Sequence, residues 1–277
     1  GLANDYFEIS LSVPSAALPQ VLPELRKQIL SPAFTAEIFE KEKDLMLREM
    51  EAVKDDPNTL AYQQFLKATY GDHPYALWSD GSTESVIKLA LDDVKTYYKN
   101  QVAAVDMIAV LAGNYSESDH KAIQDILKAV PKGSPVKINC ASAAIKKTER
   151  IESTDPRIQQ AKLYVTYAAP STADKEYVYN KILSDLLGGG MSSPYFTPLR
   201  KERGYAYSVG VSYPSRLCSS RMTGYIGLQE ENIDDAMQVM REPNRHEAAN
   251  IPEEEREKPK NHMNGQLLLD GETNTRT

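Results

Sequence analysis

The chain has 277 residues, of which 41% are hydrophobic and 26% charged, a composition that excludes a disordered or collagen-like chain. Its 32 Lys and Arg against 39 Asp and Glu give a net charge of −7, which argues against nucleic-acid binding. No stretch reaches the roughly 18 apolar residues of a membrane helix, so we expect neither nucleic acid nor a membrane as partner.

Residues 6–13 alternate between apolar and polar side chains, the pattern of a strand with one buried face. Because the chain begins with Gly1 directly before this strand, we expect a fragment or a processed product, and the cellular compartment stays unknown. A second, short apolar strand is predicted at residues 107–111. Helical patterns with turn-forming breaks between them occupy residues 21–30, 35–54, 60–70, 84–100 and 116–130.

Two of these helices have N-terminal signals. Thr35 is the expected N-cap of the second, and Ser116 followed by Asp119 resembles a capping box at the start of the last.

Residues 136–160 are polar and short of large apolar side chains, so we place a linker there, between a first lobe at 1–135 and a second at 161–277. The second lobe again mixes strands and helices. Strands are predicted at 163–168, 205–213 and 222–228, and helices at 176–187 and 232–240. Residues 241–260 are dense in charge and proline and are expected to be irregular.

Cys140 and Cys218 are far apart, and neither belongs to a Cys-x-x-Cys pair. They therefore indicate neither a zinc ribbon nor a redox motif, and we expect two unremarkable thiols.

The helix expected from residue 36 has a contradictory pattern. At about 100° per residue its apolar side chains share one arc, and Glu42 and Glu49 lie within that arc. Carboxylates are almost never buried alone, because desolvation costs several kcal/mol per ion. The two lie two helical turns apart and face one site, for which a metal ion or a buried Arg or His is the natural complement. The alternative is that this edge of the helix reaches water.

Several separated motifs, in the same order, resemble the insulinase and mitochondrial-processing-peptidase family of zinc peptidases. The longest is FEKEKDLMLREM at residues 39–50. The others are Asp56-Pro57, His73-Pro74, Gly81 with Glu84, AVLAG at 109–113, LGGGMSS at 187–193 and LRKERGYAY at 199–207. The resemblance spans residues 5–240 and resumes weakly at 260–269. It implies an α+β fold of two related lobes, each a mainly antiparallel sheet packed with helices, with the first lobe incomplete and the second truncated.

In that family His-x-x-Glu-His supplies two zinc ligands and the general base, and a glutamate on a later helix supplies the third ligand. The resemblance implies that Glu49 is this third ligand and that Glu42 steadies the site. It also implies that Arg200 and Tyr207 bind the substrate backbone and stabilise the oxyanion across the chamber from the metal. Pro198 departs from the family, where a short helix is expected, and we expect it to alter how Arg200 is presented.

The zinc site is incomplete in this chain, because His-x-x-Glu-His is absent and a catalytic zinc needs about three protein ligands. His73, His120 and His262 are expected at the surface. His246-Glu247 begins like a zincin motif, but position 250 is asparagine, so we attribute the match to chance. We therefore expect the chain alone to hold no catalytic zinc.

The resemblance implies that the parent protein is a zinc-dependent endopeptidase that cleaves extended peptides bound along a sheet edge. Two alternatives stay open: a non-catalytic partner subunit of a peptidase heterodimer, and a peptide-binding module without catalysis. A homodimer, or a heterodimer with a related pair of lobes, fits the family. Retention of both Glu42 and Glu49 on an apolar arc argues against a lobe that has lost zinc.

Overall fold

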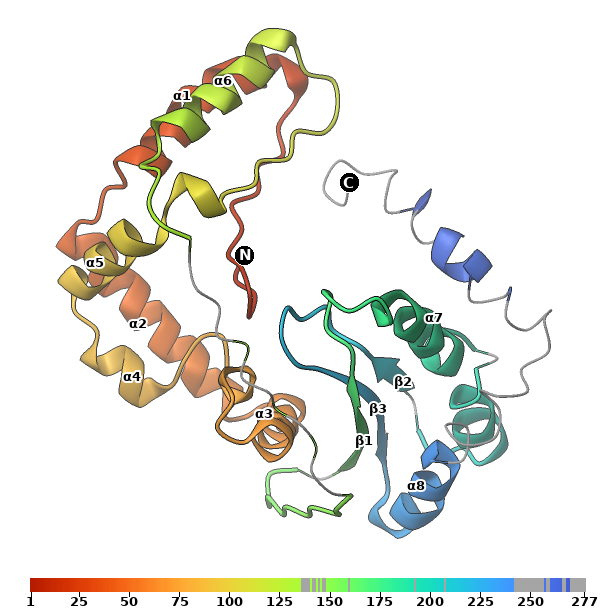
Figure 1. Cartoon of the computed structure of the whole chain (residues 1–277). Helices are drawn as coiled ribbons and strands as arrows, with labels where there is room; N and C mark the ends of the chain where they lie inside the picture. The colour runs from red at the N-terminus through yellow and green to blue at the C-terminus, as the bar shows by residue number, and fades with distance from the viewer. Residues whose placement is uncertain are drawn as a thin grey trace.

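The computed structural model describes residues 1–135, 140, 143, 145, 148–158, 160–191, 193–206, 208–241, 257, 260–265 and 268–269. Its architecture is α+β, as expected. A curved arm of helices forms the first part, and a three-stranded sheet with its own helices forms the second (Figure 1). Most of the stretch expected to be irregular, 241–260, lies outside the described residues.

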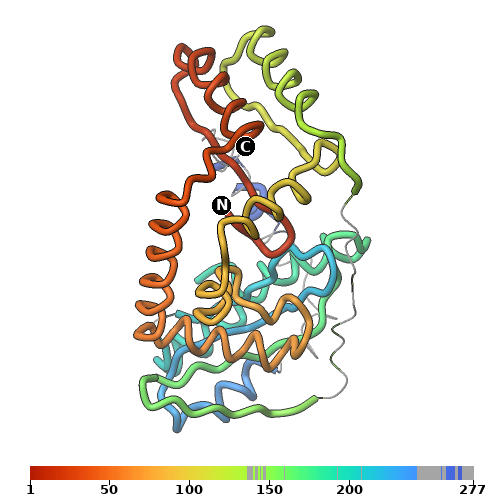
Figure 2. The backbone as a smooth tube through the Cα atoms, turned by 90° about the vertical axis from the view of Figure 1, so that its left-hand side faces the viewer, coloured from red at the N-terminus to blue at the C-terminus, as the bar shows by residue number. Residues whose placement is uncertain are grey.

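The helical arm contains all the helices predicted for the first part, and the one predicted at 84–100 is divided into two. The helices are α1 (Leu18–Leu30), α2 (Ala36–Val53), α3 (Pro57–Tyr70), α4 (Thr83–Lys88), α5 (Leu91–Gln101) and α6 (Glu117–Ala129). Single 3-10 turns lie before α1, between later helices and in the second part, at η1 (Ser15–Ala17), η2 (Pro74–Ala76), η3 (Ala104–Asp106) and η5 (Glu230–Asn232). The helices α1 and α6 lie side by side at one end of the arm in both views (Figures 1 and 2).

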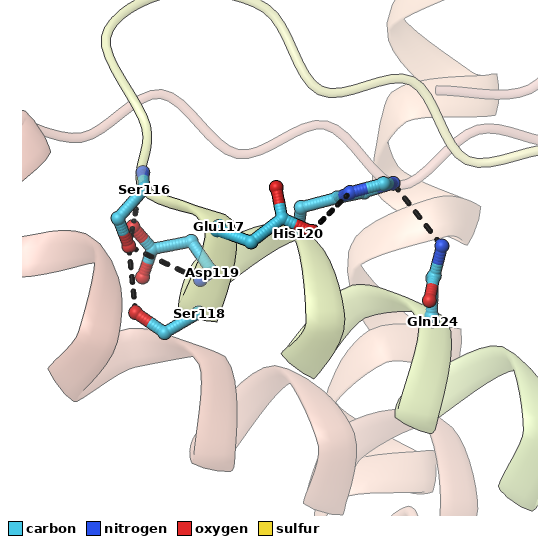
Figure 3. A network of polar contacts seen from close by, with 6 residues as sticks. All are labelled: Ser116, Glu117, Ser118, Asp119, His120 and Gln124. Carbon is cyan, nitrogen blue, oxygen red and sulfur yellow. Dashed lines mark hydrogen bonds and ion pairs between the residues drawn. The ribbon is translucent and has the colours of Figure 1, made fainter.

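Both predicted N-caps are confirmed. The Thr35 hydroxyl accepts a hydrogen bond from the Ile38 amide at 3.2 Å, and Ser116 and Asp119 form a reciprocal capping box (Figure 3). These side chains satisfy amides that have no partner within the helix, so each helix begins where its sequence signal stands.

The two strands predicted in the first part do not form. Leu2 and Phe7 make one isolated bridge, and neither residues 8–13 nor residues 107–111 join a ladder. Most of their apolar side chains are exposed to solvent, and Ile108 is 91% exposed. A strand needs a neighbour to pair its backbone amides and carbonyls, and no neighbouring strand stands beside these segments in the described ranges.

The second part contains an antiparallel sheet of β1 (Ala161–Ala169), β3 (Ser220–Leu228) and β2 (Val209–Ser212), in that spatial order. One face is covered by α7 (Tyr177–Gly188), the short π-helix η4 (Thr197–Glu202) and α8 (Ile233–Arg241). The core between these layers consists of fully buried side chains: Tyr195, Leu199, Ile226, Leu228, Ala236 and Met240. All three strands and both regular helices predicted within 161–277 are present, although the strand predicted at 205–213 is only Val209–Ser212.

Gly224 explains how closely the layers approach. A Cβ atom at this position would lie 2.7 Å from both Met240 Cε and Tyr195 Cε2, so only glycine leaves room for these two side chains against β3.

The expectation of two free thiols is wrong, because Cys140 and Cys218 form a disulfide with their Cα atoms 5.0 Å apart. Cys140 belongs to the predicted linker and Cys218 to the loop between β2 and β3. The bond therefore ties the linker to one end of the sheet. Their separation of 78 residues carries no local signal, so only the folded chain brings them together.

Arg157 ties the other end of the linker to the helical arm. Its guanidinium donates to Asp155 Oδ2 at 2.6 Å and to the carbonyl of Lys54, which follows α2, at 3.1 Å. The hydrogen bond from the Arg157 side chain lowers the pKa of Asp155 to about 2.

Replacing Arg157 by glutamine is expected to return the pKa of Asp155 toward its ordinary value near 3.8. Because the folded-state pKa is depressed, the stabilisation from this pair is fully present above pH about 4 and is lost as the pH falls through about 2. Carboxyl NMR titration of Asp155 checks this, with the exposed Arg48→Gln as control. An Asp155 pKa that is the same in Arg157→Gln and in the unaltered chain would contradict it.

Candidate functional site

Glu42 and Glu49 lie on one arc of α2, as predicted, but both side chains are exposed. The expectation of a buried pair is wrong, and the alternative that this edge reaches water describes the structure. Three apolar side chains of the same arc are exposed as well: Ile38 is 49% exposed, and Leu45 and Met46 face solvent. The others, Phe39, Met50 and Val53, are half-buried. The middle of the arc is therefore uncovered, and burial gives these carboxylates no need for a counter-charge.

The packing of α4 explains which side of α2 is covered. Lys43 Nζ donates to the carbonyls of Ile87 and Leu89, both at 2.8 Å, at the end of α4, and Met50 Sδ lies 4.0 Å from the Thr83 hydroxyl. Lys43 and Met50 lie at the rim of the apolar arc, so α4 leaves the middle of the arc open.

The described side chains do not fit a catalytic zinc ion. Within the described ranges, no three His, Cys, Asp or Glu side chains come close enough together to hold a metal. Glu42 and Glu49 together supply at most two carboxylates. A catalytic zinc ion takes about three protein ligands, and these usually include histidine. No reaction step through zinc can be assigned to these residues.

The histidines have other roles. His120, at the surface as predicted, lies 3.7 Å from Glu117 and 3.3 Å from Gln124 (Figure 3). His262 is exposed, with its Nδ1 2.9 Å from Asp185. His73 differs from the expectation, because it is half-buried and its Nδ1 accepts a hydrogen bond from the Tyr75 amide at 3.1 Å. It is the N-cap of η2, in the turn that follows α3.

Arg200 lies half-buried on η4, with its Cζ 5.0 Å from the centre of the Phe196 ring. The short helix forms despite Pro198, which occupies one of its first two positions, where a missing amide costs no helical hydrogen bond. Tyr207 lies outside the described residues. The helical layer that contains η4 covers the sheet face away from α2, so Arg200 is not brought together with Glu42 or Glu49 (Figure 1).

The opposite face of the sheet carries polar and aromatic side chains. Arg221, Thr223 and Tyr225 of β3 alternate with the core residues and point away from α7 and α8. The helix α3 packs against this face, and the rings of Phe65 and Tyr164 stack there at 4.7 Å (Figure 1). The two sets of side chains enclose a small cavity whose lining includes Tyr62, Phe65, Tyr70, Tyr164, Arg216, Arg221 and Tyr225.

Burial raises the pKa of two tyrosines in this cavity. It raises the pKa of Tyr164 to about 12 and also raises the pKa of Tyr70. A tyrosine is already neutral at pH 7 at its ordinary pKa of 10.0, and these shifts extend the range in which both hydroxyls stay protonated. The cavity is lined by aromatic rings, hydroxyl groups and two arginine side chains.

Sequence reasoning missed this cavity. The alternation of Arg221, Thr223 and Tyr225 with Met222 and Gly224 was available as a signal that β3 has one polar face. That α3, about 150 positions earlier, would cover that face could not be inferred from any local pattern.

A family model described as the peptidase M16 inactive domain matches residues 88–263. An "Uncharacterized zinc protease SCO5738" of Streptomyces coelicolor is 23% identical over 250 residues, covering 87% of this chain and 54% of the relative. A "Non-peptidase homolog YmxG" of Helicobacter pylori is 24% identical over 228 residues, covering 81% of this chain and 52% of the relative. The chain thus spans about half the length of these curated relatives.

The fold also matches solved structures. The crystal structure of a peptidase M16 inactive domain from Pseudomonas fluorescens superposes with a TM-score of 0.77 at 23% identity, covering 90% of this chain and 61% of that one. This likeness shows the fold. No helix within the described residues is long and apolar enough to cross a membrane.

Proposed function

Because this chain belongs to the peptidase M16 family, we propose that it forms part of a zinc-dependent endopeptidase that cleaves extended peptides. The family match over residues 88–263 and the relatives named zinc proteases support this proposal. The activity would belong to the whole protein, since the described residues alone do not fit a catalytic zinc.

The observation that carries the proposal is the uncovered arc of α2. An apolar face with Ile38, Leu45 and Met46 in solvent is usually covered by another element. Glu42 and Glu49 stand in the middle of that face, two turns apart. We propose that the covering element of the whole protein brings the remaining ligands, that Glu49 binds the metal, and that Glu42 orients the ligands around it.

Arg200 and Tyr207 are the proposed substrate-binding residues of the second lobe. The position of Arg200 beside the Phe196 ring supports a guanidinium that is held in place by its surroundings. In this role Arg200 and Tyr207 donate hydrogen bonds to the peptide backbone, which gives binding that is tolerant of peptide sequence.

Replacing Glu49 by glutamine in the full-length protein is expected to lower zinc affinity at least about tenfold, because a carboxylate ligand is lost. Metal content by mass spectrometry after dialysis against graded zinc checks this, and peptide cleavage is measured on the same samples. Glu40→Gln is the matched control, since Glu40 is exposed on the other side of α2. Full-length protein that takes up no zinc and stays inactive when zinc is supplied would contradict the proposal.

A second candidate is a non-catalytic, peptide-binding partner subunit. A buried pair of carboxylates would have argued against a lobe that has lost zinc. Glu42 and Glu49 are exposed, so this argument does not apply. The relative named a non-peptidase homolog also supports it. A protein of this kind binds peptides equally well with and without a chelator, and Glu49→Gln leaves that affinity unchanged.

A further inference from the structure

The cavity between α3 and the sheet contains two buried arginines without an acidic partner. Arg216 is 8% exposed and Arg221 is 3% exposed. The Nε atom of each is buried and has no hydrogen-bond partner. In the described part of the chain, no carboxylate forms an ion pair with either guanidinium. Two buried positive charges without a negative one are costly, because burial removes water that would otherwise solvate them.

The neighbours of Arg221 satisfy only some of its donors. Its Nη atoms donate to the carbonyls of Ser220 at 3.0 Å, Thr69 at 3.4 Å and Ala143, and its Cζ lies 4.6 Å from the centre of the Tyr70 ring. These groups hold the side chain in place, but none of them carries a negative charge.

Arg216 is less satisfied still. Its Cζ lies 4.5 Å from the centre of the Tyr75 ring, and its guanidinium makes no hydrogen bond to any described residue. A ring face attracts the cation, but it does not replace the missing hydrogen bond of the buried Nε atom.

Asp5, a carboxylate next to Tyr75, already has hydrogen-bond partners. Its Oδ1 accepts from the Tyr75 hydroxyl at 2.5 Å, and its Oδ2 accepts from the Leu217 amide at 3.1 Å. Asp5 therefore positions Tyr75 under Arg216 and leaves the guanidinium without an ion-pair partner.

We propose that this cavity binds the carboxylate of a ligand whose adjoining group is apolar or aromatic. A planar carboxylate matches the fork of a guanidinium, and Arg216 and Arg221 both face the cavity. The aromatic side chains of Tyr62, Phe65 and Tyr225 line the same cavity and offer contacts to the adjoining group.

The size of the cavity limits what enters it. Its volume is about 30 Å³, and one water needs roughly 10–15 Å³ of such space. The space holds about two waters or one carboxylate, so the rest of the ligand lies outside it. The carboxylate can belong to a free aromatic acid or to the C-terminus of a peptide. The inference goes beyond the proposed function and does not depend on zinc.

Calorimetric titration of the full chain with N-acetylphenylalanine and with its neutral amide tests the inference. We expect the acid to bind at least about tenfold more tightly than the amide. Arg216→Gln should weaken binding of the acid about tenfold, Arg216→Lys should retain part of it, and Arg48→Gln, on the exposed surface of α2, should leave it unchanged. A tripeptide that ends in phenylalanine distinguishes the sources: binding as a free acid identifies a peptide C-terminus, and loss of binding identifies a small acid.

Equal binding of acid and amide would overturn the inference, as would unchanged binding in Arg216→Gln or tighter binding of inorganic phosphate. The comparison of acid with amide needs no variant, so it decides the matter even if Arg216→Gln does not fold. Zinc content is not involved in any of these measurements. Failure here is thus distinct from failure of the peptidase proposal.

Discussion

Replacing Cys218 by serine is expected to lower the free energy of unfolding by about 4 kcal/mol. The disulfide with Cys140 closes a loop of 78 residues, and the loss of that restraint enlarges the conformational freedom of the unfolded chain. Urea unfolding of the full chain without reductant, followed by circular dichroism, measures the difference.

Reduction provides the matched control. Dithiothreitol should lower the stability of the unaltered chain to that of Cys218→Ser and should not affect the variant. Cys140→Ser should behave like Cys218→Ser, and the double variant should be no less stable than either, because all three lack the same bond. An unaltered chain whose midpoint is the same with and without dithiothreitol would show that the bond is absent.

Replacing Leu199 by alanine is expected to destabilise the fold by about 3 kcal/mol. Leu199 has no exposed surface, and it packs with Ile226, Leu228 and Met240 between η4 and the sheet. Its removal leaves a cavity as well as losing apolar burial, and urea unfolding measures both effects together.

Leu217→Ala is the matched control for that substitution. Leu217 is 41% exposed in the loop between β2 and β3, so its truncation should cost less than about 1 kcal/mol. Leu199 precedes Arg200 directly, so the same variant should also loosen the helix that holds Arg200. Equal losses of stability in Leu199→Ala and Leu217→Ala would contradict the described core.

Local signals predicted most of the regular structure. The period of apolar residues located the helices of the arm and all the strands of the second lobe, and Thr35 and Ser116 marked the starts of two helices because capping acts within one turn. The sequence did not show that residues 6–13 and 107–111 would have no strand beside them. Strand pairing depends on a second segment, which a period of two cannot supply.

The candidate sites were less predictable from the sequence, because they too depend on contacts between distant segments. The arc of α2 that contains Glu42 and Glu49 could be read from helical spacing, but whether anything covers it could not. The burial of Arg216 and Arg221 could not be predicted from the sequence, since an isolated arginine is usually exposed to solvent. Their burial results from α3 and Tyr75, which lie far from them in the chain.

By itself, the sequence determined the helices, the second-lobe strands, the family resemblance and the spacing of the acidic pair, because each of these depends on neighbours within a few residues or on ordered motifs. Only the tertiary structure decided the disulfide, the exposure of Glu42 and Glu49 and the enclosure of Arg216 and Arg221. Each of these features depends on whether two segments that are far apart in the sequence come into contact. Whether they do is determined by the fold of the whole chain and not by neighbouring residues.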